Sequence, residues 1–280
     1  MHRTRFAASA LLLTTVVPLA ACGGGGTSTV AEDCEPIVAD VQTAEEGKLT
    51  AAVQEYPPYV SMAGDELSGV DGVLIAEVAE RLCLEPEVQV TSITAVVESV
   101  RNGSADLTAG NWYINEERGR EFELSDPVYI DQMALLTADG ATSLDQLEGK
   151  TVGTPQGYLW VEDLQSVLGS QVKLYASEQA VYQDVRSGRT DAGVVTYGAA
   201  KHLVESNDDS ELQVELMEPD ERVEASVGQA RTAVLVHKGR TQLRDAVNQV
   251  VEEMRADGSL EQALEEAGLP ASAADVQAAS

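Results

Sequence analysis

Short apolar runs alternate with amphipathic helices along most of this chain, and the alternation limits the folds that it can adopt. Residues 48–53 predict a strand, and apolar residues then recur at the spacing of one helix face over 70–82. Predicted strands at 88–90 and 107–109 flank a second helix over 93–100. Strands separated by helices usually pair in parallel and are covered on both faces. The sequence therefore predicts an α/β fold.

The same pattern recurs further along the chain, which indicates a second lobe. The stretch 100–106, Val-Arg-Asn-Gly-Ser-Ala-Asp, is echoed at 185–191 by Val-Arg-Ser-Gly-Arg-Thr-Asp. In each copy a helix ends at a glycine, which can take the left-handed conformation that closes a helix. We expect two similar lobes. The later predicted strands are 151–153, 172–175 and 192–195, and the later helices are 159–168, 178–187, 241–256 and 260–267.

Two extended apolar stretches flank the second lobe. Residues 132–137 and 233–237 are expected to be hinge strands that carry the chain across to the second lobe and back. The predicted division is 46–130 with 230–270 for the first lobe, 131–229 for the second, and 271–280 for a tail.

The first 22 residues resemble the export signal of a bacterial lipoprotein. Arg3 and Arg5 precede an apolar, uncharged stretch over 6–21, and Leu-Ala-Ala-Cys at 19–22 is similar to the lipobox of that family. The resemblance implies cleavage before Cys22 and a lipid on its sulfur, which would hold the protein at the extracytoplasmic face of the cell membrane. The glycine-rich composition then predicts a flexible tether over 23–45. The alternative is an ordinary cleaved signal that contains a cysteine.

Charge and cysteine content narrow the possible partners. The formal net charge of −29 repels nucleic acid and anionic lipid headgroups, so no nucleic-acid partner is expected. After Cys22, only Cys34 and Cys83 remain, and in an oxidising compartment they predict one disulfide. The alternative is two buried free thiols. His202 and His237 lack Cys or acidic partners at ligand spacing, so we expect no metal site.

Three sequence blocks resemble the family 3 solute-binding proteins of bacterial ABC importers, which mostly bind amino acids. The first is the opening strand with Tyr-Pro-Pro-Tyr at 56–59. The second is Asn-Glu-Glu-Arg at 115–118 with Leu-Ser-Asp-Pro at 124–127, and the third is the stretch 144–153. The similarity spans about residues 46–270. It implies a type II periplasmic-binding fold, in which two α/β lobes joined by two hinge strands enclose a ligand cleft. It also implies a monomeric receptor without a cofactor that delivers its ligand to an ABC permease.

The resemblance assigns roles to two cleft residues. In the family an arginine binds the ligand carboxylate, and Arg118 falls on that position. Its alternative role is to cap a helix or to pair with Glu121 or Asp126. Tyr56 falls on the aromatic residue that lies against the ligand. Tyr59 is close by, and its alternative role is packing beneath the turn.

Other positions depart from the family pattern, mostly on the side that holds the ligand amine. Thr196 replaces an acid that commonly binds this amine, and the acid that often assists it corresponds to Val53, although Glu55 is two places away. The carboxylate side also changes, but the backbone amides of residues 113 and 158 could still bind a carboxylate. The remaining departures are Asn111 for glycine, Tyr113 for a small hydroxyl residue, and Tyr158 after the matching Gly157, where Thr or Ser is usual.

Aromatic residues concentrate at the predicted cleft, which suggests the ligand class. Aromatic faces attract cations, by about 0.5–2 kcal/mol each, and stack on flat ligands. We therefore hypothesise a ligand with a cationic, cyclic or alkylated amine and a carboxylate. The alternative is that the rings face the core or merely narrow the cleft. The expected ligand-binding residues are Glu55, Tyr56, Tyr59, Asn111, Trp112, Tyr113, Arg118, Gly157, Tyr158, Thr196 and Tyr197, with Trp160 as a further aromatic beside the cleft.

Three functions are compatible with these features. The main prediction is the substrate-binding lipoprotein of an ABC importer, which binds an amino acid or a related amine and catalyses no reaction. The first alternative is a sensory lipoprotein. The second is an enzyme that resembles the dehydratases of aromatic amino-acid synthesis on the same fold. Such an enzyme needs a positioned acid or base, for which Glu55 and Glu162 are the candidates.

Overall fold

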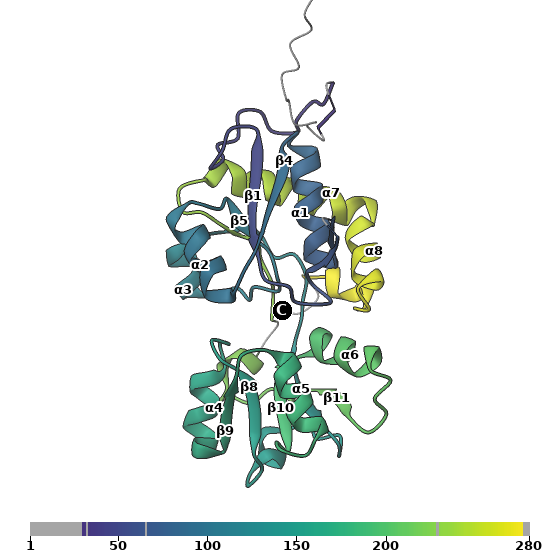
Figure 1. Cartoon of the computed structure of the whole chain (residues 1–280). Helices are drawn as coiled ribbons and strands as arrows, with labels where there is room; N and C mark the ends of the chain where they lie inside the picture. The colour runs from purple at the N-terminus through teal and green to yellow at the C-terminus, as the bar shows by residue number, and fades with distance from the viewer. Residues whose placement is uncertain (1–29, 32, 65, 228–229, 277–280) are drawn as a thin grey trace, which may run out of the picture.

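The protein is described by a computed structural model that covers residues 30–31, 33–64, 66–227 and 230–276. The predicted signal and Cys22 lie outside the described residues. Two lobes lie one above the other in Figure 1, and each is built on a five-stranded sheet. This is the mixed α/β architecture that the sequence predicts.

The first lobe contains a sheet with the strand order β4-β1-β5-β12-β6. Its first three strands are parallel, as expected when helices connect them, and β12 runs antiparallel to its neighbours. Helices α1, α7 and α8 contact one another beside this sheet and share one large apolar core. The elements are β1 (Lys48–Val53), α1 (Val70–Arg81), β4 (Glu85–Val90), α2 (Ile93–Asn102), β5 (Leu107–Thr108), α3 (Glu116–Glu121), β6 (Glu123–Leu124), β12 (Leu235–Val236), α7 (Thr241–Asp257) and α8 (Ser259–Glu266), with the hairpin β2 (Ser61–Ala63) and β3 (Glu66–Ser68).

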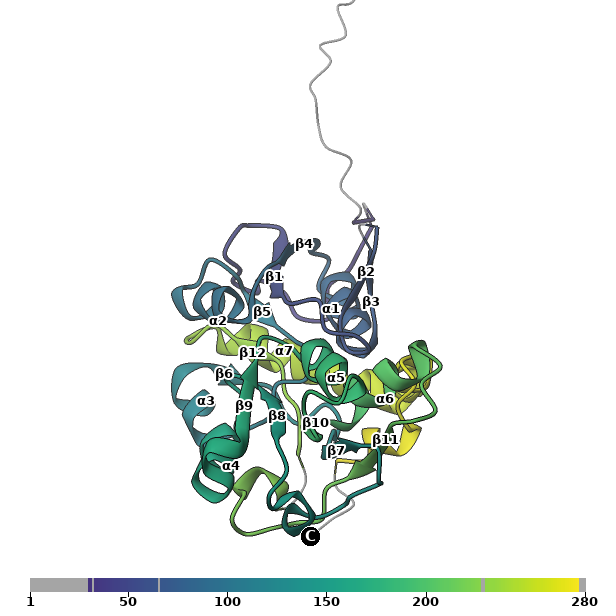
Figure 2. The same ribbon diagram turned by 60° about the horizontal axis from the view of Figure 1, so that its bottom comes forward.

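The second lobe contains a sheet with the order β11-β7-β10-β8-β9. Strands β8, β9 and β10 are parallel, and β7 is antiparallel to both of its neighbours. In Figure 2 this lobe comes forward, with α4 on one side of the sheet and α5 and α6 on the other. The elements are β7 (Met133–Thr137), β8 (Val152–Pro155), α4 (Val161–Leu168), β9 (Val172–Tyr175), α5 (Glu178–Arg186), β10 (Ala192–Thr196), α6 (Tyr197–Ser206) and β11 (Gln213–Leu216), with 3-10 turns at Leu144–Leu147, Gly169–Gln171, Glu224–Ser226 and, in the first lobe, Ala271–Ala274.

The stretches predicted as hinge strands belong to the sheets instead. All five residues of β7 are buried, and the strand pairs with β10 and β11. Strand β12 pairs with β5 and β6 in the same way. A continuous apolar run is typical of a strand covered on both faces, which an exposed hinge cannot provide. The two crossing segments meet just outside these strands, where Ile130 bridges Arg231 and the Asp131 N–H donates to the Ala230 carbonyl at 3.0 Å.

Parts of the predicted tether and of the predicted tail pack against the first lobe. Ile37 and Val38 lie against its apolar core, although the sequence places them in the tether. Ala273 and Ala274, predicted as tail, are buried in the same core. Their small apolar side chains gain burial that a solvated tail would not provide.

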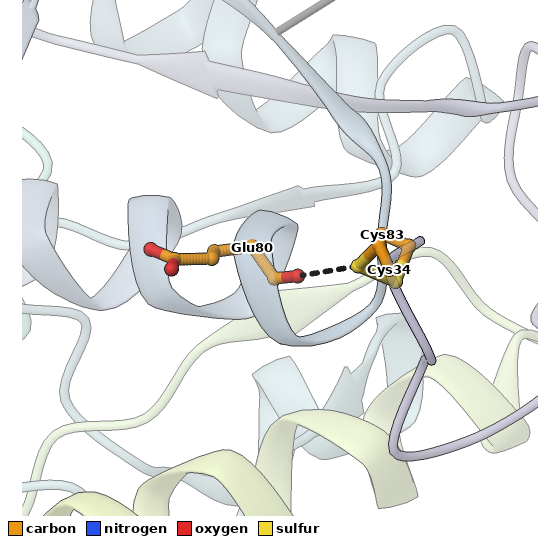
Figure 3. The surroundings of a disulfide bond; sticks show 3 residues. All are labelled: Cys34, Glu80 and Cys83. Carbon is orange, nitrogen blue, oxygen red and sulfur yellow. Dashed lines mark hydrogen bonds between the residues drawn. A yellow bond between two sulfur atoms is a disulfide. The ribbon is translucent and has the colours of Figure 1, made fainter. Parts of the chain in front are cut away.

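The predicted disulfide between Cys34 and Cys83 is present at the end of α1, with a Cα–Cα distance of 5.9 Å (Figure 3). Cys83 takes the left-handed conformation, with φ of 56°, in place of the usual glycine. Its N–H donates to Glu80, and the N–H of Leu84 donates to Ala79, so the last carbonyls of α1 are satisfied. The bond therefore secures the N-terminal segment where the helix turns into β4.

In the part of the chain that the structure describes, no helix is both long and apolar enough to span a membrane.

Candidate functional site

A cavity of about 290 Å³ lies between the two lobes. It is lined by residues that follow the carboxyl ends of β1 and β5 in the first lobe and of β8, β9 and β10 in the second. Parallel strands of one sheet present their carboxyl ends at the same edge, so both sheets supply loops to this space. One face of α6 completes the wall with Ala199, His202, Leu203 and Ser206.

Nine of the eleven predicted ligand-binding residues line this cavity. They come from segments far apart in the sequence, which the fold brings to one place. These residues are Glu55, Tyr56, Asn111, Trp112, Tyr113, Arg118, Gly157, Tyr158 and Thr196.

The other two predicted residues, Tyr59 and Tyr197, do not line the cavity. Tyr59 is fully buried beneath the turn, and its hydroxyl donates to Asp131 Oδ2 at 2.6 Å. Tyr197 begins α6 on the helix face opposite the one that carries His202 and Ser206, because successive helical residues are rotated by about 100°. Neither residue therefore belongs to the wall of this cavity.

Arg118 lies in the cavity wall without a carboxylate partner. Within the described ranges it forms no ion pair, since Glu121 pairs with Arg101 and the Asp126 N–H bonds to Asn248. The guanidinium donates to the Tyr113 carbonyl and lies over the Trp112 ring, 5.0 Å from its centroid. Burial lowers the pKa of Arg118 to about 10, so the group is still charged at neutral pH. A desolvated cation of this kind can bind an anionic ligand group.

Two other residues that line the cavity carry buried polar atoms without hydrogen-bond partners among the described residues. The Tyr113 hydroxyl is buried and has no hydrogen-bond partner among the described residues. Tyr113 also forms an isolated antiparallel β-bridge with Thr232. The hydrogen bonds of that bridge are made by the residues on either side, so the backbone N–H of Tyr113 points away from Thr232. The Oδ1 atom of Asn111 is likewise buried and unpaired, while its Nδ2 donates to Asp131 at 2.7 Å. Asn111 has a φ of 58°, a conformation that asparagine tolerates better than most residues. Donors and an acceptor are thus available for a polar ligand.

A chain of hydroxyl groups crosses the cleft from one lobe to the other. Tyr158 of the second lobe donates to the Tyr56 hydroxyl of the first at 2.9 Å. The Tyr56 hydroxyl bonds to Thr196 Oγ1 at 2.9 Å, and Thr196 Oγ1 lies 3.3 Å from Glu178 Oε2. Direct contacts between lobes identify this arrangement as closed.

Glu178 ends this chain as a buried acid in the second lobe. It is the first residue of α5, directly after β9, and it is 3% exposed. The Thr196 N–H donates to Glu178 Oε1 at 2.8 Å. Burial raises the pKa of Glu178 to about 8, and the nearby Asp131 adds to the shift. No Lys, Arg or His in the described ranges forms an ion pair with it. The carboxyl therefore faces the cavity without a cation to pair with.

Residues 49–268 match the sequence profile of the bacterial extracellular solute-binding proteins, family 3. The chain belongs to this family. It is 31% identical over 230 residues to the L-cystine-binding protein TcyJ of Escherichia coli, covering 79% of this chain and 82% of that protein. It is 26% identical over 218 residues to the histidine-binding periplasmic protein of the same species, covering 74% of this chain and 81% of that protein.

Solved structures of similar proteins share the two-lobed fold. An amino acid ABC transporter substrate-binding protein of Streptococcus pneumoniae, bound to L-arginine, is 26% identical with a TM-score of 0.67, covering 79% of this chain and 94% of that one. An ancestral arginine-binding protein bound to glutamine is 25% identical with the same TM-score, covering 79% of this chain and 98% of that one. The fold of this family 3 protein is thus the type II periplasmic-binding fold that the sequence predicts.

Sequence reasoning missed two acids of this family 3 site. Glu178 was noticed only as the start of a helix, and Asp131 only as a domain boundary. Asp131 accepts hydrogen bonds from Tyr59 of the first lobe and from the Gly198 N–H of the second, at 2.6 and 3.2 Å. Glu178 could have been identified from its position, because it follows a predicted strand whose carboxyl end meets the cleft.

The residues considered for enzymatic or metal chemistry give no further site. Glu55 is exposed at the cavity wall, and Glu162 is exposed outside it. The described residues contain no group of three or more His, Cys, Asp or Glu side chains that could hold a metal ion.

Proposed function

We propose that this protein is the receptor of an ABC importer and binds an amino acid between its lobes. The observation that carries the proposal is that the wall of one cavity contains both the Arg118 guanidinium and the buried carboxyl of Glu178. Neither group has an ion-pair partner among the described residues. An amino acid carries a carboxylate, which can bind the Arg118 guanidinium, and an ammonium group, which can bind the Glu178 carboxyl. Because each group comes from a different lobe, one ligand would bridge both.

The walls of the cavity narrow the ligand further. Tyr56, Trp112 and Tyr158 line it with aromatic surface, which favours a cationic or flat ligand body. All three residues already make a contact, since the Arg118 guanidinium lies over Trp112 and the hydroxyl groups of Tyr56 and Tyr158 bond to each other. The relatives that bind cystine, histidine and arginine support an amino acid with a long or cationic side chain. Such a side chain would extend along the α6 face that contains His202 and Ser206.

The cellular setting follows from the N-terminal sequence and the family. The lipobox-like run at 19–22 supports a lipid on Cys22, which would hold a monomer at the extracytoplasmic face of the membrane. Ligand-induced closure would then present one joined surface of both lobes to the permease. The sequence similarity to transporter binding proteins supports this partner.

The two tryptophans of the chain make the proposal testable, because Trp112 and Trp160 both line the cavity. Purified protein lacking residues 1–22 is titrated with L-cystine, L-histidine, L-arginine, L-lysine and L-glutamine while tryptophan fluorescence is recorded. At least one should change the emission saturably and raise the melting temperature with concentration. Sugars and nucleosides should do neither. If no amino acid binds more tightly than at millimolar concentration, the proposal is wrong.

A further inference from the structure

We infer that Asp131 stabilises the closed form of the hinge, because its side chain accepts hydrogen bonds from both lobes where the chain crosses between them. Asp131 is then a positioning residue. It lies outside the cavity wall and acts on the ligand through the residues that it holds in place. The inference rests on the proposed function, since it concerns how the same cleft stays closed around an amino acid.

The crossing segment changes lobe at Asp131. On one side, the N–H of Ile130 donates to the Ala273 carbonyl of the first lobe at 2.9 Å. On the other side, the carbonyl of Gln132 accepts from the Tyr197 N–H of the second lobe at 2.9 Å. Hinge motion is absorbed by a few residues at the ends of elements. When the lobes rotate against each other, this segment must therefore change its conformation between these two bonds, at or beside Asp131.

The Asp131 side chain meets donors from the two sides of this hinge. Its Oδ2 atom accepts from the Tyr59 hydroxyl at 2.6 Å and from Asn111 Nδ2 at 2.7 Å, both in the first lobe. Its Oδ1 atom accepts at 3.2 Å from the N–H of Gly198, in the first turn of α6 in the second lobe. Asp131 is 3% exposed, so water replaces none of these bonds easily. A carboxylate only accepts hydrogen bonds, which suits three converging donors.

The complete set of bonds is a property of the closed form. Asn111 is held in the first lobe, where its own N–H donates to Asp71 at 2.8 Å. The Gly198 N–H moves with α6 and the second lobe. Opening of the cleft therefore separates the donors, and the Asp131 side chain can follow only one of the two lobes. Whichever lobe it follows, at least one bond breaks and water must replace it.

Two of the three donors belong to parts of the protein that form the cavity. Asn111 lines it from the first lobe, and the helix that begins beside Gly198 lines it from the second. The N–H groups in the first turn of a helix have no partner within the helix, and negative charge is favourable there. Within the described residues, Thr196 at the N-cap supplies no side-chain bond to them. Asp131 therefore positions one wall of the cavity from each lobe.

The test separates the rate of ligand association from the rate of release. Stopped-flow tryptophan fluorescence is recorded at pH 7.5 with L-cystine, L-histidine, L-arginine, L-lysine and L-glutamine. Asp131→Asn keeps the shape of the side chain but turns one acceptor oxygen into a donor, so at least one of the three donors loses its partner in the closed form. For every probe that binds, the release rate should rise by about tenfold or more. The association rate should change by less than about twofold, since the bond is made only on closure.

A second variant removes one of the same bonds from the other side. Tyr59→Phe deletes only the hydroxyl that donates to Asp131, and Tyr59 lies outside the cavity wall, so the change removes no direct ligand contact. It should also speed release. The double variant with Asp131→Asn should release the ligand more slowly than the product of the two single effects predicts, because the changes remove a shared bond. If Asp131→Asn does not fold, Tyr59→Phe still tests the bond.

Tyr129→Phe is the matched control. The Tyr129 ring is stacked beside that of Tyr59, with 6.2 Å between the ring centroids. Its hydroxyl also donates to a buried acid, Asp71, at 2.7 Å, but both of these partners belong to the first lobe. Loss of this hydroxyl can lower the melting temperature as Tyr59→Phe does. It should leave the release rate within about twofold of the wild type, because the bond does not depend on closure.

The outcomes separate the two proposals. A probe that is released at the wild-type rate from both Asp131→Asn and Tyr59→Phe would overturn the role of Asp131 and leave the receptor function intact. Equal effects of Tyr59→Phe and Tyr129→Phe, or single effects that simply multiply in the double variant, would also overturn that role. If none of the five probes binds to the wild type, the proposed function and the role of Asp131 both fail.

Discussion

Arg118 and Glu178 give the cleft two ends of opposite chemistry. The arginine is held by a short helix of the first lobe, where the Asn115 side chain accepts from the Arg118 N–H at 2.8 Å. The glutamate is held by the start of α5 in the second lobe, close to Thr196. Neither has an ion-pair partner among the described residues. Burial of two ionisable groups without ion-pair partners is costly, and a ligand that pairs with both would recover that cost.

Replacement of Arg118 tests the carboxylate end. Arg118→Ala should weaken amino-acid binding at least 30-fold, because loss of a buried charged contact costs about 2 kcal/mol or more. The melting temperature should change little, since Arg118 makes no ion pair in the described part of the chain. The matched control is Arg120→Ala, because Arg120 is on the same helix and its side chain is 70% exposed. Equal affinities for the two variants would make Arg118 a structural residue.

At this scale, residues at family positions were easier to place in the cavity wall than residues that depart from the family pattern. Arg118 and Tyr56 could be located because they stand at family positions in recognisable blocks. Glu178 could not, because its contact with Thr196 depends on β9 and β10, which are separated by β8, ending at the same edge of one sheet, and spacing along the chain does not show this. Tyr59 lies outside the cavity wall, because the turn that presents Tyr56 to the cavity directs Tyr59 into the core.

At the scale of elements, α6 limits how closely the two lobes approach, and the disulfide holds the N-terminal segment to the first lobe. Gly198, in the first turn of α6, packs against Tyr59 and Leu269 of the first lobe. A Cβ atom there would lie 2.4 Å from the Tyr59 hydroxyl and 2.5 Å from Leu269 Cδ2. The helix can approach the first lobe this closely only because the residue is glycine. The disulfide acts at the other end of that lobe, where α1 turns into β4.

A side chain added at position 198 should therefore keep the two lobes further apart. Gly198→Ala should weaken ligand binding about tenfold, because overpacking costs about 1–3 kcal/mol in the closed state. Small-angle scattering should show a larger radius of gyration with ligand present than for the wild type. Gly72→Ala is the control, since its added Cβ would meet its neighbours at 3.4 Å, an ordinary contact. An unchanged radius and affinity for Gly198→Ala would show that α6 does not limit closure.

Loss of the disulfide should affect stability and leave binding intact. The bond closes a loop with a sequence separation of 49 residues, for which the chain-entropy estimate is about 4 kcal/mol. Reduction, or the double change Cys34→Ser with Cys83→Ser, should lower the melting temperature by several degrees. Amino-acid affinity should be unchanged, because the bond is not part of the cavity wall. Reductant should have no further effect on the double variant, and a loss of affinity would contradict this division of roles.

Elements were predictable where periodicity was strong. The predicted strand bounds at 48–53 and 172–175 are those of β1 and β9, and the helix predicted over 241–256 ends one residue later. The stretch 132–137 was misread because an apolar run looks the same in a buried strand and in a hinge. The predicted tail was misread because Ala273 and Ala274 gain their burial from contacts far away in the sequence.

For the molecule as a whole, closure connects buried acids in both lobes. Asp71 bonds to Tyr129 in the first lobe, Asp131 bonds to both lobes, and Glu178 belongs to the second. Burial raises the pKa of Asp71 and Asp131 to about 6 and that of Glu178 to about 8. In the folded protein these acids keep their protons to a higher pH than in the unfolded chain. Stability must then fall as the pH rises through this window.

Thermal melting of the ligand-free protein against pH tests this expectation. The free energy of unfolding should fall from pH 5 to pH 8, by at most about 1.4 kcal/mol for each group and pH unit, and the melting temperature should fall with it. Glu178→Gln should flatten the curve between pH 6 and 8, above the range of the two aspartates. Both proteins carry nearly the same net charge, so the difference between their curves excludes the effect of the −29 net charge on the melting temperature. Parallel curves for the two proteins would show that Glu178 is ionised throughout.

The Cys34–Cys83 bond joins the N-terminal segment to the first lobe. A lipid on Cys22, as proposed above, would therefore hold the first lobe rather than the second near the membrane. The first lobe would then stay near the bilayer, and the second lobe would move relative to it during closure. A permease in the membrane would then recognise the ligand-bound state by the changed position of the second lobe.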